Sequence, residues 1–221
     1  YNQGQLKIVL DQAGSLLQTF PNSFALHNIY GVASQGLGLY NAALEAYKEV
    51  CKIKPDYPEA YNNMGIVFHE KGMLEEAITS YQKALDIKPN YATAYTNMGS
   101  ALHEKGMLEE AIISYQSAIK INPKHAEAYC NKGNTFHQQG KPDKALEAYH
   151  EALKIKPDYA EAKINLAELL KTFSTENTIN NQLISLDLRI KSRAQKAIFL
   201  KNNSEIACSL IELLEEVHLV D

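Results

Sequence analysis

The sequence predicts an all-α solenoid of antiparallel helix pairs, and three observations support this fold class. Prolines recur every 34 residues, as does a column of glycines, and such a period indicates a repeat architecture. Between these markers the apolar residues follow the i, i+3, i+4, i+7 spacing of one helix face. One helix pair cannot bury such a face alone, whereas stacked pairs can. The two columns are Pro21, Pro55, Pro89, Pro123 and Pro157, and Gly4, Gly38, Gly72, Gly106 and Gly140.

The first predicted element is a single helix over Gln5–Thr19. Gly4 and Pro21 flank it in the same register as the glycine and proline that flank the second helix of each later unit. Residues 1–23 are therefore interpreted as the second helix of a truncated or partial repeat.

Four units follow, residues 24–57, 58–91, 92–125 and 126–159, and each is expected to form two helices. In the unit 58–91, the first helix is predicted over Pro58–Lys71 and the second from about Leu74 to Ile87. Gly72 between them is a typical C-terminal stop, and the short connection makes the two helices antiparallel neighbours. A second glycine column lies inside the first helices, where glycine costs about 1 kcal/mol against alanine. Its recurrence at Gly31, Gly65, Gly99 and Gly133 predicts that the partner helix approaches too closely for a Cβ.

The period ends near residue 173. Residues 160–173 are expected to form the first helix of a final partial repeat, with Ala167 in place of the helix glycine. The segment 174–221 is expected to form a non-repeat C-terminal helical cap, with helices over about 183–200 and 204–219. An open solenoid end needs such a cover.

The repeated residues resemble the tetratricopeptide repeat. In the unit 58–91 the resemblance rests on Tyr61, Met64, Gly65, Phe68, Ala77, Tyr81, Ala84 and Pro89. It extends over residues 1–173, although the unit 24–57 matches less well, with His27, Tyr30 and Ser34 at three of these places. The resemblance implies a right-handed superhelix whose first helices line a concave groove.

Membership in such a family implies that the polar columns of the first helices face a ligand. The candidate peptide-binding residues are Asn62, Asn63, Ile66, His69, Glu70, Thr96, Asn97, Ser100, His103, Glu104, Cys130, Asn131, Asn134, His137 and Asn165. An asparagine amide both donates and accepts, which suits it to hold a peptide backbone. The column Asn63, Asn97, Asn131, Asn165 is similar to the asparagine ladder of O-linked N-acetylglucosamine transferases. The alternative is that these amides only connect adjacent first helices and stabilise the stack.

We expect no metal and no cofactor. Zinc ligands lie about 2 Å from a common centre, whereas neighbouring helices are about 8–10 Å apart. His69, His103 and His137 therefore cannot share one ion, and the three cysteines have no ligand spacing. Their number also favours a reducing, cytoplasmic location.

Composition limits the partners. The net charge of −4 argues against nucleic acid, and no apolar run is long enough to span a membrane. The first helices carry no basic clamp of the kind that binds chaperone C-terminal tails. A groove of Glu, His and Asn is expected to prefer a neutral or mildly basic protein or peptide.

The sequence contains no nucleotide-binding or catalytic motif, so it predicts a non-catalytic protein–protein interaction scaffold rather than an enzyme. The alternative is a substrate-recruiting repeat module of a larger, glycosyltransferase-like modifying enzyme. The chain is expected to be a monomer or to self-associate weakly, and the apolar face of residues 206–217 could dock on its own chain or on another.

Overall fold

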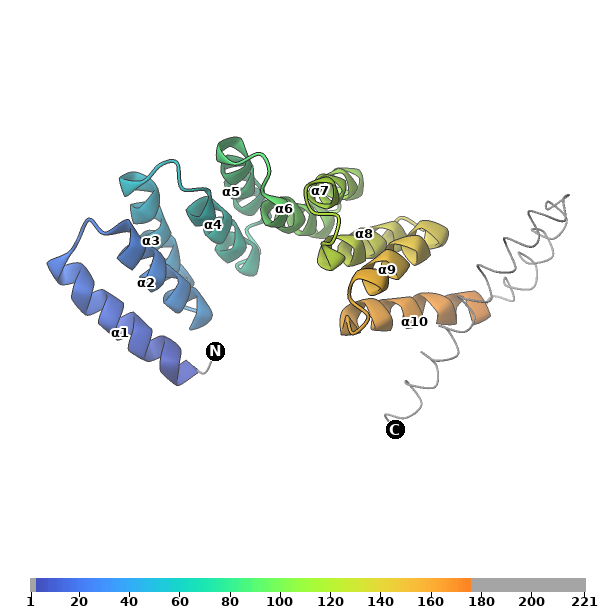
Figure 1. Ribbon diagram of the computed structural model, residues 1–221, viewed down its shortest axis with the longest axis horizontal. Helices are drawn as coiled ribbons and strands as arrows, with labels where there is room; N and C mark the ends of the chain where they lie inside the picture. The colour runs from blue at the N-terminus through green and yellow to red at the C-terminus, as the bar shows by residue number, and fades with distance from the viewer. Residues whose placement is uncertain (1–2, 176–221) are drawn as a thin grey trace, which may run out of the picture. The chain divides into compact units, whose positions relative to one another are not determined.

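The computed structural model describes residues 3–175 of the chain, and side chains as far as residue 171. Within that range every regular element is a helix (Figure 1). The helices are α1 (Gln3–Thr19), α2 (Phe24–Gly36), α3 (Tyr40–Ile53), α4 (Pro58–Glu70), α5 (Leu74–Ile87), α6 (Ala92–Glu104), α7 (Leu108–Ile121), α8 (Ala126–Gln138), α9 (Pro142–Ile155) and α10 (Ala160–Thr175). The predicted cap beyond residue 175 lies outside the described residues.

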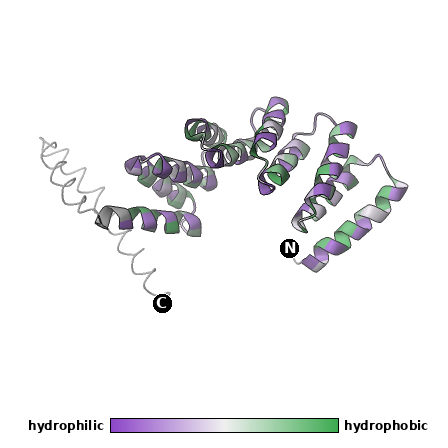
Figure 2. Ribbon diagram, turned by 180° about the vertical axis from the view of Figure 1, so that it is seen from behind, coloured by the Kyte–Doolittle hydropathy of each residue, from purple (hydrophilic) through white to green (hydrophobic). Residues whose placement is uncertain are grey.

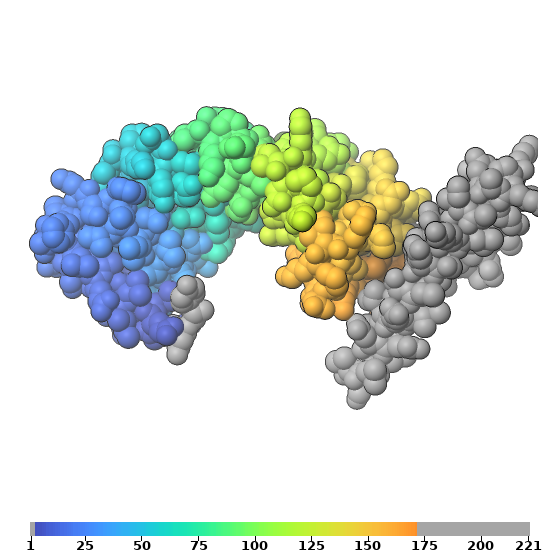
Figure 3. Space-filling model, viewed as in Figure 1, coloured from blue at the N-terminus to red at the C-terminus, as the bar shows by residue number. Residues whose placement is uncertain are grey.

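The chain divides into two units, Tyr1–Thr135 and Phe136–Asp221, which are described separately. In the first unit consecutive helices pack against each other from α1–α2 through α6–α7, most extensively within the pairs α2–α3, α4–α5 and α6–α7. The first helices α2, α4 and α6 also contact one another in sequence. Figure 3 shows these helices as successive bands in chain order. In the second unit α9 packs against α10.

The helix boundaries lie close to the recurrent glycines and prolines of the sequence. The helix expected from about Leu74 to Ile87 is α5, with those bounds, whereas α1 begins two residues earlier than expected. At the end of α4, the Gly72 N–H donates to the His69 carbonyl at 2.8 Å and the Met73 N–H to Phe68 at 2.9 Å. This is a Schellman motif, and it requires the left-handed φ of +72° that Gly72 adopts without steric cost.

The glycines inside the first helices confirm the predicted close approach. A Cβ added to Gly65 would lie 2.5 Å from Cε1 of Tyr81, and one added to Gly99 would lie 2.6 Å from Cε1 of Tyr115. Each tyrosine projects from the second helix of the same pair, and both are buried. The glycine column therefore exists to receive the tyrosine column.

The core lies between the helices of successive pairs. One cluster joins Ala77, Tyr81 and Ala101, with Ile66 and Phe68 packed against it. Figure 2 shows that the helices carry hydrophobic and hydrophilic residues on different sides, as the periodicity predicted. No helix among residues 3–175 has the length and apolar character needed to cross a membrane.

Candidate functional site

Most candidate residues within the compact unit 1–135 gather on one side of α4, α6 and α8, which we call the first-helix face. It comprises Asn63, Ile66, His69, Glu70, Asn97, Ser100, His103, Glu104, Asn131 and Asn134. All of these side chains are half-buried except the exposed Glu70 and Glu104. His137 is exposed near the end of α8 and Asn165 is half-buried in α10, so both belong to the second unit.

Three predicted site residues do not lie on this open face. Asn62 is 3% exposed, Thr96 1% and Cys130 0%, and all three occupy the fifth position of their first helices. The Thr96 hydroxyl donates to the Ala92 carbonyl of its own helix at 3.2 Å. The structure corrects the prediction for these residues, because their side chains are buried in the folded chain.

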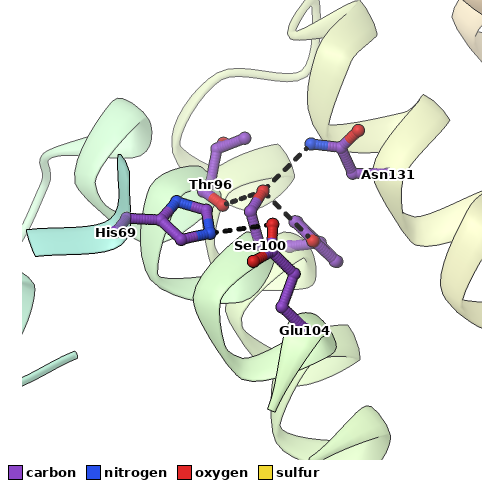
Figure 4. A network of polar contacts seen from close by, with 6 residues as sticks. His69, Thr96, Ser100, Glu104 and Asn131 are labelled. Carbon is purple, nitrogen blue, oxygen red and sulfur yellow. Dashed lines mark hydrogen bonds and ion pairs between the residues drawn. The ribbon is translucent and has the colours of Figure 1, made fainter. Parts of the chain in front are cut away.

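The asparagine column makes hydrogen bonds between helix pairs. The Nδ2 of Asn97 donates to the Oδ1 of Asn62 at 3.0 Å, and the Nδ2 of Asn131 donates to the Oγ of Ser100 at 3.3 Å (Figure 4). Asn63 makes no hydrogen bond to any residue that the structure describes. The amide oxygens of Asn97 and Asn131 likewise accept none within that range. Part of this column therefore stabilises the stack, and its acceptors stay available.

A second set of polar contacts joins the ends of the first helices. The Nε2 of His69 lies 2.9 Å from the Oε1 of Glu104, one helix pair later. One pair earlier, the Nε2 of Gln35 donates to the Glu70 carboxylate at 3.4 Å. The same Gln35 accepts the hydroxyl hydrogen of Tyr47 at 3.1 Å. In both cases the twelfth residue of one repeat unit contacts the thirteenth residue of the next unit. This contact was not predicted from the sequence.

The buried tyrosines end beneath this face, but their hydroxyl groups differ in their partners. Tyr115 donates to Ser100 at 3.4 Å and lies near Thr135, whose own hydroxyl donates to the Asn131 carbonyl at 2.8 Å, and burial raises the pKa of Tyr115 to about 12. The Tyr81 hydroxyl is buried without a hydrogen-bond partner among the described residues. Burial, and then the nearby Glu70 and Glu104 carboxylates, raise the pKa of Tyr81 well above its usual value.

Sequence register explains this difference. Ser100 and Thr135 occupy the places that Ile66 and Ala101 hold around Tyr81, one unit earlier. Both of these apolar residues pack in the Tyr81 cluster and can accept no hydrogen bond. The tyrosines were not among the predicted site residues, and the unpaired hydroxyl of Tyr81 was not predicted from the sequence. The sequence signal for the unpaired hydroxyl was the apolar Ile66 at the position where the next unit has Ser100.

No group of three His, Cys, Asp or Glu side chains among the described residues is arranged to hold a metal ion. An open surface hollow of about 550 Å³ lies at the turn before α3, lined by residues 38–42 and Lys71. The Lys71 ammonium donates to Asn41 there at 2.7 Å. The hollow contains no candidate site residue.

The comparisons with known proteins define the class of the molecule. The TPR repeat model matches residues 37–72, 67–106 and 99–140, and the tetratricopeptide repeat model matches residues 126–159. These matches cover more than half of the chain, and the chain belongs to the tetratricopeptide repeat family. No curated protein matches.

Several solved structures are similar. The crystal structure of MamA shares 25% sequence identity with a TM-score of 0.65, covering 72% of this chain and 92% of that one. YrrB, described as a TPR protein with an unusual peptide-binding site, shares 23% identity with a TM-score of 0.60, covering 72% and 82%. The first TPR domain of Spaghetti (RPAP3), solved with the HSP90 peptide SRMEEVD, shares 23% identity with a TM-score of 0.51, covering 53% and 93%.

Proposed function

We propose that this chain is a non-catalytic scaffold that binds an extended polypeptide segment along the first-helix face of α4, α6 and α8. The observation that carries the proposal is the asparagine column. Asn63, Asn97 and Asn131 each offer an amide oxygen that accepts no hydrogen bond within the described residues. A peptide N–H is the donor that such an oxygen suits.

The spacing of the column fits an extended chain. Packed helices lie about 8–10 Å apart, so equivalent residues of adjacent first helices are separated by about one such step or slightly more. An extended peptide rises about 3.3 Å per residue, so about every third residue would meet an asparagine. Contacts to the backbone would hold peptides of many sequences, with the residues between the asparagines setting preference.

The known relatives support the proposal by analogy of fold. YrrB and the Spaghetti domain are peptide-binding according to their descriptions, and both have this helix-pair architecture. The proposal extends that role to the present chain. It rests on the open acceptors of the first-helix face rather than on the fold alone.

Asn63 allows a sharp test, because its side chain can be removed without breaking a hydrogen bond to the described residues. An array of immobilised peptides of unrelated sequence is probed with the wild type and with Asn63→Ala. The control is Asn90→Ala, because Asn90 is exposed in the connection between α5 and α6. We expect Asn63→Ala to weaken binding across the array and Asn90→Ala to leave it unchanged. Equal binding by wild type and a folded Asn63→Ala would refute the role of the column.

A further inference from the structure

Two adjacent first helices of this repeat array, α4 and α6, carry acidic side chains without basic ones. The first helices α4 and α6 contain Glu59, Glu70 and Glu104 but no lysine or arginine. The lysines near their ends have partners away from the first-helix face. Lys105 pairs with Glu75 of α5 at 3.2 Å, and Lys88 pairs with Glu59 at 3.4 Å. Glu70 and Glu104 are therefore not neutralised by a lysine or arginine contact within the described residues.

The contacts between units use N–H donors of this face, and the two carboxylates that take part keep further acceptor capacity. Gln35 donates an N–H to Glu70, and Asn97 donates one to Asn62. The His69 ring nitrogen beside Glu104 must carry hydrogen, because a carboxylate can only accept. The Glu104 side chain nevertheless remains 57% exposed. A ligand that meets the face between α4 and α6 finds carboxylate and amide oxygens in excess of N–H groups.

A buried hydroxyl marks the same place independently of these charges. The Tyr81 side chain is 0% exposed, and its hydroxyl has no partner among the described residues. The equivalent Tyr47 and Tyr115 hydroxyls reach side chains of the first helices, so Tyr81 ends beneath the same face. An unpaired buried polar group commonly indicates a partner that is missing. Here it lies close enough to Glu70 and Glu104 for their charges to act on it.

We propose that the seat formed by Glu70, Glu104 and the underlying Tyr81 receives a lysine or arginine side chain, so that the partner is a cationic polypeptide segment. This inference rests on the proposed function and names its ligand class. An arginine is favoured over a lysine, because its planar fork of donors can bind two carboxylates at once. In doing so it adds a permanently charged partner for Glu104 beside His69.

The test uses the same peptide array, scored for the charge of the peptides that bind. The variant is Glu70→Gln with Glu104→Gln, in which each glutamine keeps an acceptor for the contacts to Gln35 and His69. The control is Glu76→Gln with Glu110→Gln, which changes the net charge equally from exposed positions on α5 and α7. Circular dichroism and chemical unfolding verify that both double variants are folded.

We expect wild-type binding to be enriched in lysine- and arginine-containing peptides and to weaken as salt rises. In the Glu70/Glu104 variant the affinity for these peptides should fall about five- to twentyfold, as for two partly exposed ion pairs. The Glu76/Glu110 variant should retain the wild-type affinity. An equal loss in both double variants would overturn the seat, because general charge would then explain it.

The outcomes separate this inference from the proposed function. Binding of peptides without preference for basic residues, but with dependence on Asn63, would overturn the cationic partner and leave the scaffold role standing. Binding that is insensitive to Asn63 would remove the proposed function itself. Preference for acidic peptides would overturn the cationic partner as well.

Discussion

Replacement of single tyrosines by phenylalanine tests the packing scheme most directly. Tyr47, Tyr81 and Tyr115 occupy the same position in three successive units, and all three rings are buried. The substitution removes one hydroxyl and keeps the ring against its glycine. Only the hydrogen bonds differ, since Tyr47 and Tyr115 have partners and Tyr81 has none among the described residues.

The expected changes in the free energy of unfolding have opposite signs. A buried polar group without a partner costs about 1–3 kcal/mol, so Tyr81→Phe should raise the free energy of unfolding by about 1 kcal/mol after the small void is allowed for. A net hydrogen bond contributes about 0.5–1.5 kcal/mol, so Tyr115→Phe should lower it by about 1 kcal/mol. The two chemically identical substitutions should therefore differ by about 2 kcal/mol.

Urea unfolding followed by circular dichroism measures this difference, with Tyr47→Phe as a second paired reference. Repeat arrays can unfold in steps, so the transition midpoints are compared only when the slopes agree among the variants. A loss of stability in Tyr81→Phe equal to that in Tyr115→Phe would show that the Tyr81 hydroxyl has a partner in the folded protein. It would also remove one of the two supports for the cationic seat.

Three further predictions concern the same helix pairs. Gly99→Ala should lower the free energy of unfolding by about 1–3 kcal/mol despite the better helix propensity of alanine, because the new Cβ would meet the Tyr115 ring at 2.6 Å; thermal unfolding measures this, and an unchanged transition would contradict the close packing. Asn97→Ala should cost about 1–3 kcal/mol because it leaves the buried Asn62 oxygen unpaired, whereas Asn63→Ala should cost much less; equal costs in chemical unfolding would contradict the assignment of the two amides. Burial raises the pKa of Tyr115 from 10.0 to about 12, so the stability that its neutral hydroxyl contributes should be present below pH 10 and should fall by about 2–3 kcal/mol as the pH rises to 12; in unfolding titrations the wild type should be more stable than Tyr115→Phe below pH 10 and less stable at pH 12, and a constant difference would contradict the raised pKa.

The helix pairs could be predicted from the sequence because their signals are local and repeated. Gly72 ends a helix through its own φ, and the apolar spacing around Ala77 is visible within a few residues. The close packing at Gly65 could also be predicted from the sequence, since a residue that weakens a helix recurs only where a neighbouring group leaves no room for a Cβ. That the approaching group is the Tyr81 ring became clear only in three dimensions.

The functional face was predicted in outline and corrected in detail. Helical periodicity placed Asn62 beside Asn63 on the polar side of α4, but it could not indicate that the next first helix covers one and leaves the other half-exposed. Thr96 and Cys130 were also predicted to lie on the open face, and both are buried. The cover of Asn62 involves Asn97, about one period later, and a single helix carries no record of it.

The sequence by itself determined the period, the helix pairs and the family, because backbone sterics and amphipathic spacing act within each unit and return in the next. Only the tertiary structure decided which polar groups remain available. Whether Asn97 offers both of its amide N–H groups or only one depends on Asn62 of the preceding unit. Whether the Tyr81 hydroxyl is paired depends on Ile66 and Ala101 from two different units. Hydrogen-bond donors and acceptors are matched through space, and stacking brings together residues that the chain keeps about 35 positions apart.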